Sequence, residues 1–305
     1  MKIIYGHVFK KLRINKGYTI KEITDSEISS ATISKFEHGS IMISTDKFFR
    51  ILAKINTSPA EFTSYLSQYL VNFYSFSEVN DYFLDFEVHR LSSIKLTNLI
   101  RMVERQTTLF PEMNFLKLSL IALKSLTSQK TSNCKYGVST RELKTIRQYL
   151  LMRKTWCEFE LWIYCSTIHL FDLQSIKLLS RKLFSPLTYV IITSDMDKRI
   201  STAIGRLSYV LVSDENIRND NYKKFFDSLL LYLEENPISS KQTLEKAFIK
   251  FNIGVYRYYN NQKSYGIREM KKVIKSLSLL GCNELGDYLI SEFKTRTGML
   301  YFLLE

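Results

Sequence analysis

The chain has 305 residues, a formal net charge of +13 and a hydrophobic fraction of 45%. Its length supports a sizeable buried core in two domains, and its four prolines and ten glycines favour helices and exclude collagen-like and disordered classes. The excess of positive charge favours an anionic partner such as nucleic acid or a membrane surface.

The N-terminal stretch MKIIYGHVFKKL lacks the sustained apolar run and the small-residue cleavage site of a signal peptide. No later run approaches the roughly eighteen apolar residues that a membrane-spanning helix needs. We therefore expect a cytoplasmic protein with no membrane partner.

Catalytic and metal-binding motifs are missing from the sequence. It contains no Gly-rich phosphate loop and no HExxH or GxSxG motif. The four histidines are scattered, and the cysteines at 134, 157, 165 and 282 show no CxxC spacing, which argues against zinc and against a disulfide framework. We expect no enzymatic activity, no cofactor and no metal, and we interpret the cysteines as buried thiols.

The first two predicted helices have clear boundaries. Residues 8–12 place apolar side chains on one helical face, and Gly17 ends that helix. Thr19 and Glu22 have the spacing of a capping box, which predicts a short second helix through Ile23.

The stretch SSATISKFEHGS predicts a third helix, Ser30 to His38, with few large side chains. Ser29 is the available N-cap, and Gly39 ends the helix. Packing through Ile33 and Phe36 alone would leave an open polar face on this helix. That face must either approach a partner closely or have no role.

Two further helices complete the N-terminal part. ISTDKFFRILAKI is amphipathic and predicts the fourth helix, and SPAE starts the fifth, with Pro59 first and Glu61 closing a capping box from Ser58. The second and third helices are joined by TDSEI, which is the spacing of a helix-turn-helix. We assign residues 1–66 to a helix-turn-helix domain and residues 67–305 to a second, helical domain.

Longer helices with aromatic stripes are predicted after residue 66. They lie near 79–105, 111–129, 139–153, 155–171, 195–212, 217–235, 241–260, 263–281 and 284–303. Two of the starts have apparent capping boxes, Ser139 with Glu142 and Ser239 with Gln242. The β-branched stretch YVIITS at 189–194 is interpreted as a helix end or connector, because an isolated strand has no partner here.

One segment of the second domain resembles a tetratricopeptide unit. It combines Asn252, Gly254 and Tyr258 with the small Gly266 and then Ile267, and small residues at such positions let paired helices approach closely. The predicted fold is therefore all-α: a five-helix helix-turn-helix domain followed by a tetratricopeptide-like helical solenoid.

The open face of the third helix suits the major groove of double-stranded DNA. Small residues at its start let the backbone approach the bases, and hydroxyl groups can bond base edges or phosphates while Ala31 touches a thymine methyl. Lys35, Lys21 and Arg13 could supply charge to phosphates. The alternative is an ordinary surface helix with Ser and Ala as neutral filler.

LRINKGYTIKEI, SSATISKFEHG and FFRILAKINTSPAEF together resemble the phage-repressor-type (XRE) helix-turn-helix. The wording SKFEHG, KFFRIL and INTSPAEF is similar to the Rgg/GadR/MutR transcription regulators of Gram-positive bacteria, and RKTWCEFELWIY resembles the Trp-Glu helix of their central domain. The resemblance implies a homodimer whose helical repeat domain serves dimerisation and binds a short signalling peptide, a secreted pheromone that is imported again.

The resemblance also implies site residues. Those that match DNA-contacting positions of the repressor motif are Arg13, Lys21, Ser29, Ser30, Ala31, Thr32, Ser34 and Lys35. In the repeat domain we expect Arg153 and Asn252 to line a concave peptide groove, where Arg would hold a carboxylate and Asn would bond backbone amides. A solvated Arg153 and an Asn252 that bridges neighbouring helices are the open alternatives.

Three hypotheses about function remain at this point. The first is a peptide-responsive, DNA-binding regulator that takes part in quorum sensing. The second is a DNA-binding repressor without a peptide effector, whose repeat domain only dimerises or senses redox through a cysteine. The third is a helical-repeat scaffold for protein interactions whose helix-turn-helix only packs or dimerises.

Overall fold

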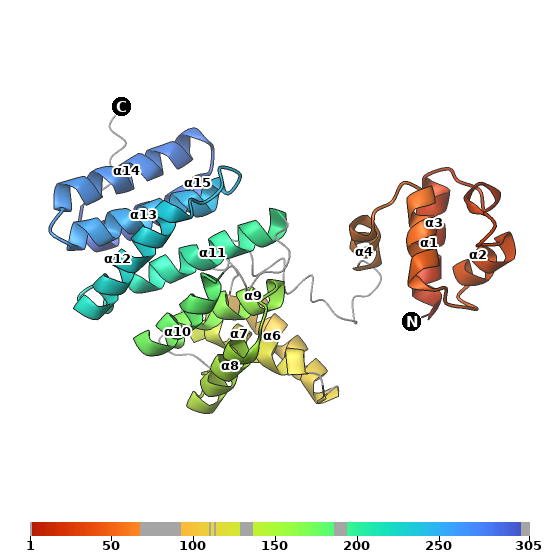
Figure 1. Cartoon of the computed structure of the whole chain (residues 1–305), viewed down its shortest axis with the longest axis horizontal. Helices are drawn as coiled ribbons and strands as arrows, with labels where there is room; N and C mark the ends of the chain where they lie inside the picture. Colours follow the sequence, from red (N-terminus) through yellow and green to blue (C-terminus); the bar gives the residue numbers. More distant parts are fainter. Residues whose placement is uncertain are drawn as a thin grey trace. The chain divides into compact units, whose positions relative to one another are not determined.

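The computed structural model describes residues 2–67, 93–109, 111–112, 114–128, 137–185 and 194–299. The chain divides into two compact units, Met1–Asp81 and Tyr82–Glu305. Every regular element of the described residues is a helix, as the sequence predicted (Figure 1). The units divide within residues that the structure does not describe, so the boundary after residue 66 stays a prediction.

The first unit is the expected small helical bundle. Its elements are α1 (Lys2–Asn15), the 3-10 helix η1 (Lys21–Ile23), α2 (Ser30–Glu37), α3 (Thr45–Lys54) and α4 (Pro59–Ser67). Its core gathers one apolar face from each element: Val8, Phe9, Leu12, Ile23, Ile28, Ile33, Phe36, Ile51, Leu52, Ile55, Phe62 and Leu66. Burial of these side chains is the main favourable term that holds the bundle together.

Glycine ends the first and third elements as predicted. Gly17 and Gly39 have φ values of +79° and +70°, the left-handed region that glycine adopts without steric cost. The amide of Tyr18 donates to the Arg13 carbonyl at 3.0 Å, and that of Ser40 donates to the Lys35 carbonyl at 2.9 Å. Both are the long hydrogen bond of a Schellman motif, which satisfies helix-terminal carbonyls.

The second predicted helix is present as a short 3-10 helix that ends at Ile23, as predicted. The capping bonds are also present, because the Thr19 amide donates to Glu22 at 2.7 Å before the turn Lys21–Ile23. Thr24 is already extended, with ψ of 157°, and Asp25 accepts the amide hydrogens of the next segment. The aspartate offers these amides a turn in place of a helix, so the helix stops after three residues.

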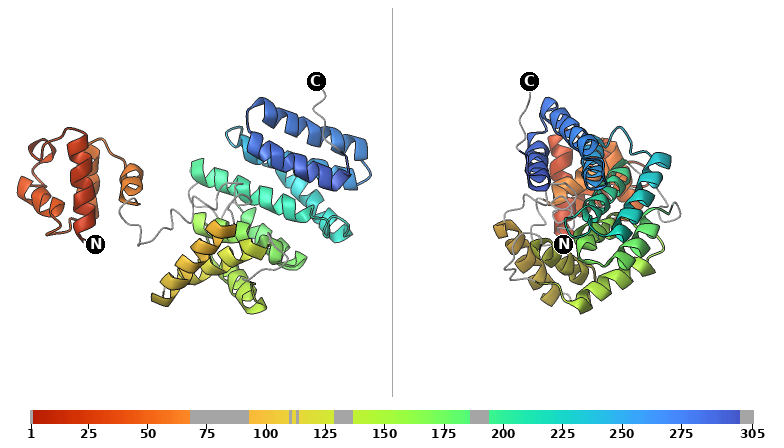
Figure 2. Two further views of the ribbon diagram at one scale, coloured as in Figure 1. Left: turned by 180° about the vertical axis from the view of Figure 1, so that it is seen from behind. Right: turned by 90° about the vertical axis from the view of Figure 1, so that its left-hand side faces the viewer.

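The second unit is an array of helices. Its elements are α6 (Ser93–Leu109), α7 (Asn114–Ser128), α8 (Thr140–Met152), α9 (Glu158–Thr167), η3 (Ile168–Leu170), α10 (Leu173–Leu183), α11 (Ser194–Leu211), α12 (Asp220–Glu235), α13 (Thr243–Tyr259), α14 (Lys263–Leu279) and α15 (Asn283–Thr297). α7, α9, α11 and α13 form a row in which each helix packs on the next. In Figures 1 and 2, α11 lies between the α6–α10 group and the α13–α15 group.

Most predicted helices of this unit are present, with two differences. α10 was missed, although Asp172 caps it by accepting the Ser175 amide at 2.7 Å. The capping box at Ser139 and Glu142 is confirmed, whereas the one at Ser239 and Gln242 is wrong. α13 begins at Thr243, and the Gln242 side chain makes no capping hydrogen bond.

Some predicted segments, including 111–129 and 284–303, contain residues outside those that the structure describes. Residues 79–92 of the first predicted long helix lie outside the described residues. So do residues 189–193 of YVIITS, whereas α11 begins at the next residue, Ser194.

The tetratricopeptide-like segment forms the close helix pair that its glycines predicted. A Cβ placed on Gly266 of α14 would lie 2.5 Å from the Gly254 carbonyl oxygen and 2.6 Å from the Tyr258 nitrogen, both in α13. Only the absence of a side chain at residue 266 allows this approach of the two backbones. The pair α13–α14 is therefore fixed by a specific glycine contact.

Candidate DNA-binding face and effector domain

The turn that precedes α2 is organised by Asp25. Its carboxylate accepts the amide hydrogens of Glu27 and Ile28, each at 2.9 Å, and pairs with Lys54 of α3 at 2.7 Å and Arg50 at 3.3 Å. The hydrogen bond from Lys54 is the largest cause that holds the pKa of Asp25 well below its usual range. The turn and the start of α2 are thereby tied to α3.

The exposed face of α2 has the predicted composition. Ile33 and Phe36 are fully buried, while Ser30, Ala31 and Lys35 are exposed. Because the two large side chains are used for packing, the outer surface of the helix is left with small and polar groups. This orientation confirms the amphipathic pattern, whereas the contact of this face with DNA stays a prediction.

Ser29 and Thr32 have a structural role at the start of α2. The Ser29 hydroxyl oxygen accepts the Thr32 amide hydrogen at 3.2 Å, and the two hydroxyls lie 2.9 Å apart. Ser29 is exposed and is the predicted N-cap, which satisfies one of the orphan amides of the helix. Its hydroxyl can contact a phosphate only in addition to this capping bond.

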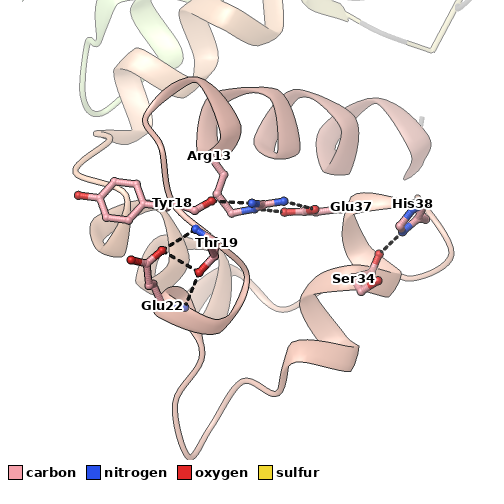
Figure 3. Close-up of polar contacts among 7 residues, drawn as sticks. All are labelled: Arg13, Tyr18, Thr19, Glu22, Ser34, Glu37 and His38. Atoms are coloured by element: carbon pink, nitrogen blue, oxygen red, sulfur yellow. Dashed lines mark hydrogen bonds and ion pairs between the residues drawn. The ribbon is translucent and has the colours of Figure 1, made fainter.

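The C-terminal end of α2 is held by His38. Its Nδ1 donates to the Ser34 carbonyl oxygen at 2.7 Å, one turn earlier (Figure 3). Ser34 itself is half-buried, and Lys21 is exposed at the start of η1. Ser34 and Lys21 can therefore still reach a partner outside the domain, and their contact with DNA stays a prediction.

The prediction that Arg13 contacts phosphate is contradicted by its position. The residue is only 6% exposed, and its Nε and second guanidinium nitrogen donate to the two Glu37 carboxylate oxygens at 2.6 and 2.8 Å (Figure 3). The remaining guanidinium nitrogen donates to the Tyr18 carbonyl at 2.6 Å. Each of its three guanidinium nitrogens makes a hydrogen bond inside the domain, so Arg13 joins α1 to α2 instead of reaching outward.

Glu37 was not identified from the sequence. It is the acidic residue of SKFEHG and one of the most buried charges of the first unit, at 3% exposure. A glutamate directly before the end of the helix, on the same face as Ile33, was the available signal. It fixes the far end of the exposed face against α1, as Asp25 fixes the near end against α3.

Arg153 occupies an accessible position in the second unit. It is exposed at the C-cap of α8, with its guanidinium 4.8 Å from the centroid of the Tyr149 ring. The Tyr149 hydroxyl in turn donates to Glu160, and Lys182 of α10 donates to the Arg153 carbonyl oxygen. The ring orients the guanidinium while leaving its edge open to a carboxylate.

The prediction that Asn252 lines a groove is contradicted. Its side chain is 2% exposed, and its Nδ2 donates to the Ser208 hydroxyl oxygen of α11 at 2.9 Å. That hydroxyl donates to the Gly205 carbonyl at 2.7 Å. Asn252 therefore bridges α13 and α11, because a buried amide needs a partner in place of water.

The two tryptophans near Arg153 belong to the core of the second unit. Trp156 and Trp162 are buried, and the Trp156 indole donates to the Leu150 carbonyl at 3.0 Å.

The expectation that the cysteines are buried thiols holds for Cys165, whose burial raises its pKa to about 12. It is wrong for Cys157, which is exposed at the N-cap of α9, and Cys282 is only half-buried, while Cys134 lies outside the described residues.

The described residues contain no cluster of three or more His, Cys, Asp or Glu side chains arranged to hold a metal ion. No helix in the described part of the chain combines the length and the apolar character needed to cross a membrane.

Comparison with known families places both units. Residues 95–290 match the family described as HTH-type transcriptional regulator Rgg, C-terminal domain, and residues 9–62 match a helix-turn-helix family. The first match covers more than half of the chain. The resemblance noted in the sequence is thereby confirmed.

Three solved structures illustrate the fold. The SHP pheromone receptor Rgg2 of Streptococcus dysgalactiae has a TM-score of 0.64 at 18% identity, covering 96% of this chain and 100% of that one. ComR from S. thermophilus, in complex with DNA and its signalling peptide ComS, has 0.52 at 13%, covering 97% and 100%. A bacterial peptide pheromone/receptor complex has 0.57 at 14%, covering 98% and 99%. At these identities the likeness establishes a shared fold.

Proposed function

Because the chain belongs to the family of Rgg HTH-type transcriptional regulators, we propose that it is a cytoplasmic homodimer that binds promoter DNA and is controlled by a short signalling peptide. The observation that supports this best is the exposed face of α2. Ser30, Ala31 and Lys35 face outward from a helix whose two ends are tied to α3 and α1. A rigid helix with small residues at its start suits entry into a major groove.

Direct contacts are assigned to the exposed face alone. Ser30 and Ala31 would meet base edges, while Lys21 and Lys35 would neutralise phosphates. Thr32 and Ser34 are half-buried and would contribute hydroxyls from the side of the helix. Arg13 has no part in these contacts, since its charge is neutralised by Glu37.

Peptide control is assigned to the second unit. The matched family domain spans 95–290, and ComR, which has the same fold, was crystallised with a signalling peptide. The structure offers Arg153 as an exposed group for a peptide carboxylate. A peptide can change DNA binding only if it binds one arrangement of the dimer better than another, because equal affinity for both shifts nothing.

Footprinting on the DNA upstream of the gene tests the DNA-binding part. A dimer on two half-sites is expected to protect two patches about one helical turn apart or a multiple of it. A single patch would contradict the homodimer, and no protection even at low salt would contradict DNA binding.

Calorimetry with short peptides encoded beside the gene tests peptide control. Binding of one peptide, with a changed footprint in its presence, is the expected result. Failure of every such peptide to bind, together with unchanged regulation in cells that lack peptide import, would favour a repressor without a peptide effector.

A further inference from the structure

A cavity of about 350 Å³ lies between α10 and α12. It is lined by three cationic side chains, two aromatic rings and one hydroxyl: Lys177, Arg181, Phe184, Lys224, Phe225 and Ser228. This volume is at the small end of the range for ligand sites, which is roughly 300–1,000 Å³. Arg181, Lys224 and Ser228 are exposed, so the cavity is open to solvent on one side.

The cations of this cavity lack acidic partners among the described residues. Lys223, the residue before Lys224 on α12, pairs with Asp220 at 3.1 Å, whereas no described carboxylate pairs with Lys177, Arg181 or Lys224. Three like charges around one opening repel each other when it is empty. An anion placed among them would relieve this repulsion and be held by several charge-assisted hydrogen bonds.

The aromatic rings give the cavity an apolar wall. Phe184, the residue that follows α10, packs on Tyr232 of α12, with ring centroids 4.2 Å apart, and the Lys177 ammonium lies 5.6 Å from the Phe225 centroid. Contacts between the helices thus fix the rings beside the cations. A matching ligand has an anionic group joined directly to an apolar body.

We propose that this cavity binds the carboxyl-terminal residue of a peptide, with the carboxylate at the cations and an apolar side chain against the rings. The small volume suits the end of a longer molecule, and the open side lets the rest of the chain leave. This inference rests on the proposed peptide control and specifies which part of the effector is recognised.

The position of Arg153 agrees with a peptide that extends beyond the cavity. Arg181 lines the cavity, and Lys182, the next residue of α10, donates to the Arg153 carbonyl oxygen. α10 therefore connects the cavity to the exposed end of α8. In this arrangement the cavity takes the terminal carboxylate, and Arg153 is left for an acidic side chain of the same peptide.

Ligand-observed NMR on the full chain tests the cavity with defined probes. N-acetyl-L-phenylalanine, which has a free carboxylate, is compared with N-acetyl-L-phenylalanine amide, which has the same ring and no charge. We expect the acid to bind with about millimolar affinity, as its size allows, and the amide to bind at least tenfold more weakly.

Single substitutions locate the binding. Lys177→Gln and Lys224→Gln, on facing helices, are each expected to weaken binding of the acid about threefold to tenfold. Lys272→Gln, a matched change at an exposed lysine of α14, is expected to leave it unchanged. Circular dichroism confirms that each variant is folded, and the use of two helices guards against a local distortion.

Three results would overturn the inference: absence of binding by the acid, equal binding of the acid and the amide, or no effect of either cavity substitution. Preferential binding of adenosine monophosphate that displaces the acid would overturn it in favour of a nucleotide site. The proposed function is tested by a different result, because it requires only that a peptide encoded beside the gene binds somewhere on the second unit. Peptide binding at another place would overturn the cavity site and leave peptide control intact.

Discussion

Arg13 and Glu37, which are 24 residues apart, form a buried ion pair with two hydrogen bonds that joins α1 to the C-terminal end of α2. Each side chain is nearly inaccessible, so neither charge can be hydrated if the other is removed. The pair therefore holds α2, with its exposed face, in a fixed position on the domain. It stabilises the site without belonging to it.

Arg13→Ala should destabilise the first unit by about 3–5 kcal/mol, because it leaves the Glu37 carboxylate buried and unpaired. Both tryptophans, Trp156 and Trp162, are in the second unit, so their fluorescence does not report on this change. Hydrogen exchange measured by mass spectrometry does, and it should show lost protection in the first unit, including α1 and α2, with unchanged protection in the second unit.

Lys35→Ala is the control, since that side chain is exposed and its removal should leave exchange unchanged. Arg13→Met with Glu37→Leu should recover much of the lost stability, because no unpaired charge remains. Normal protection in Arg13→Ala, together with a reduced salt slope of DNA binding, would restore the phosphate interpretation.

Asp25 should make the first unit sensitive to acid. Its pKa is lower in the folded chain than in the unfolded chain, where it is about 3.9. The stabilisation by ionised Asp25 is therefore fully present above that pH and is lost as the pH falls below it. Asp25→Asn keeps an oxygen acceptor for the turn amides but removes the charge. Hydrogen exchange of wild type and variant should differ most at pH 7, and the difference should shrink steadily as the pH is lowered from 4 toward 2; a pH-independent difference would contradict the role of the charge.

DNA binding should separate two classes of substitution on the exposed face. Lys21→Ala or Lys35→Ala should weaken binding to all sequences alike and reduce the salt slope by about one for each lost phosphate contact. Changes at Ser30 or Ala31 should alter sequence preference with little change in slope. Fluorescence anisotropy at several salt concentrations, with Lys272→Ala as the control, distinguishes them. A changed preference and a normal slope in Lys35→Ala would reverse the assigned roles.

The local features of the first unit could be predicted because adjacent residues determine them. Ser29 caps α2, Gly39 ends it, and Ile33 with Phe36 sets its buried face, and all three are visible in eleven consecutive residues. The Arg13–Glu37 pair was not predictable in the same way. Arg13 stands among other basic and polar residues of α1, as a surface arginine would, so the sequence does not indicate that its partner lies on another helix.

The second unit shows the same limit. Gly254 and Gly266 predicted a close helix pair, because glycine destabilises the interior of a helix and its presence there indicates close packing. Asn252 lies two residues before Gly254 and was misassigned, because a polar residue that bridges two helices and one that lines a groove have the same sequence pattern. Only the position of Ser208 on α11 separates the two roles.

Gly266→Ala should destabilise the second unit by roughly 1–3 kcal/mol or more, because the new methyl would meet backbone atoms of α13 that cannot rotate away. Gly286→Ala in α15 is the matched control. Its Cβ would have no neighbour within 4 Å, so the change should be neutral or stabilise by up to about 1 kcal/mol. Urea unfolding followed by tryptophan fluorescence measures both variants. Equal stabilities of the two would show that the helices can separate without cost.

Arg153→Ala and Asn252→Ala should affect different properties, peptide binding and stability respectively, because the first residue is exposed and the second is buried. Asn252→Ala removes the buried hydrogen bond that the Ser208 hydroxyl oxygen accepts and should cost about 1–3 kcal/mol of stability in the urea experiment. Arg153→Ala should leave stability and DNA binding of the unliganded protein nearly unchanged. It should weaken the affinity for the effector peptide, measured by calorimetry, at least tenfold. Arg257→Ala, at another guanidinium that stacks on a tyrosine ring, is the matched control and should retain peptide binding. Full peptide affinity in Arg153→Ala would mean that the cation is only a solvated end of α8, and peptide recognition would then have to rest on other residues of the second unit.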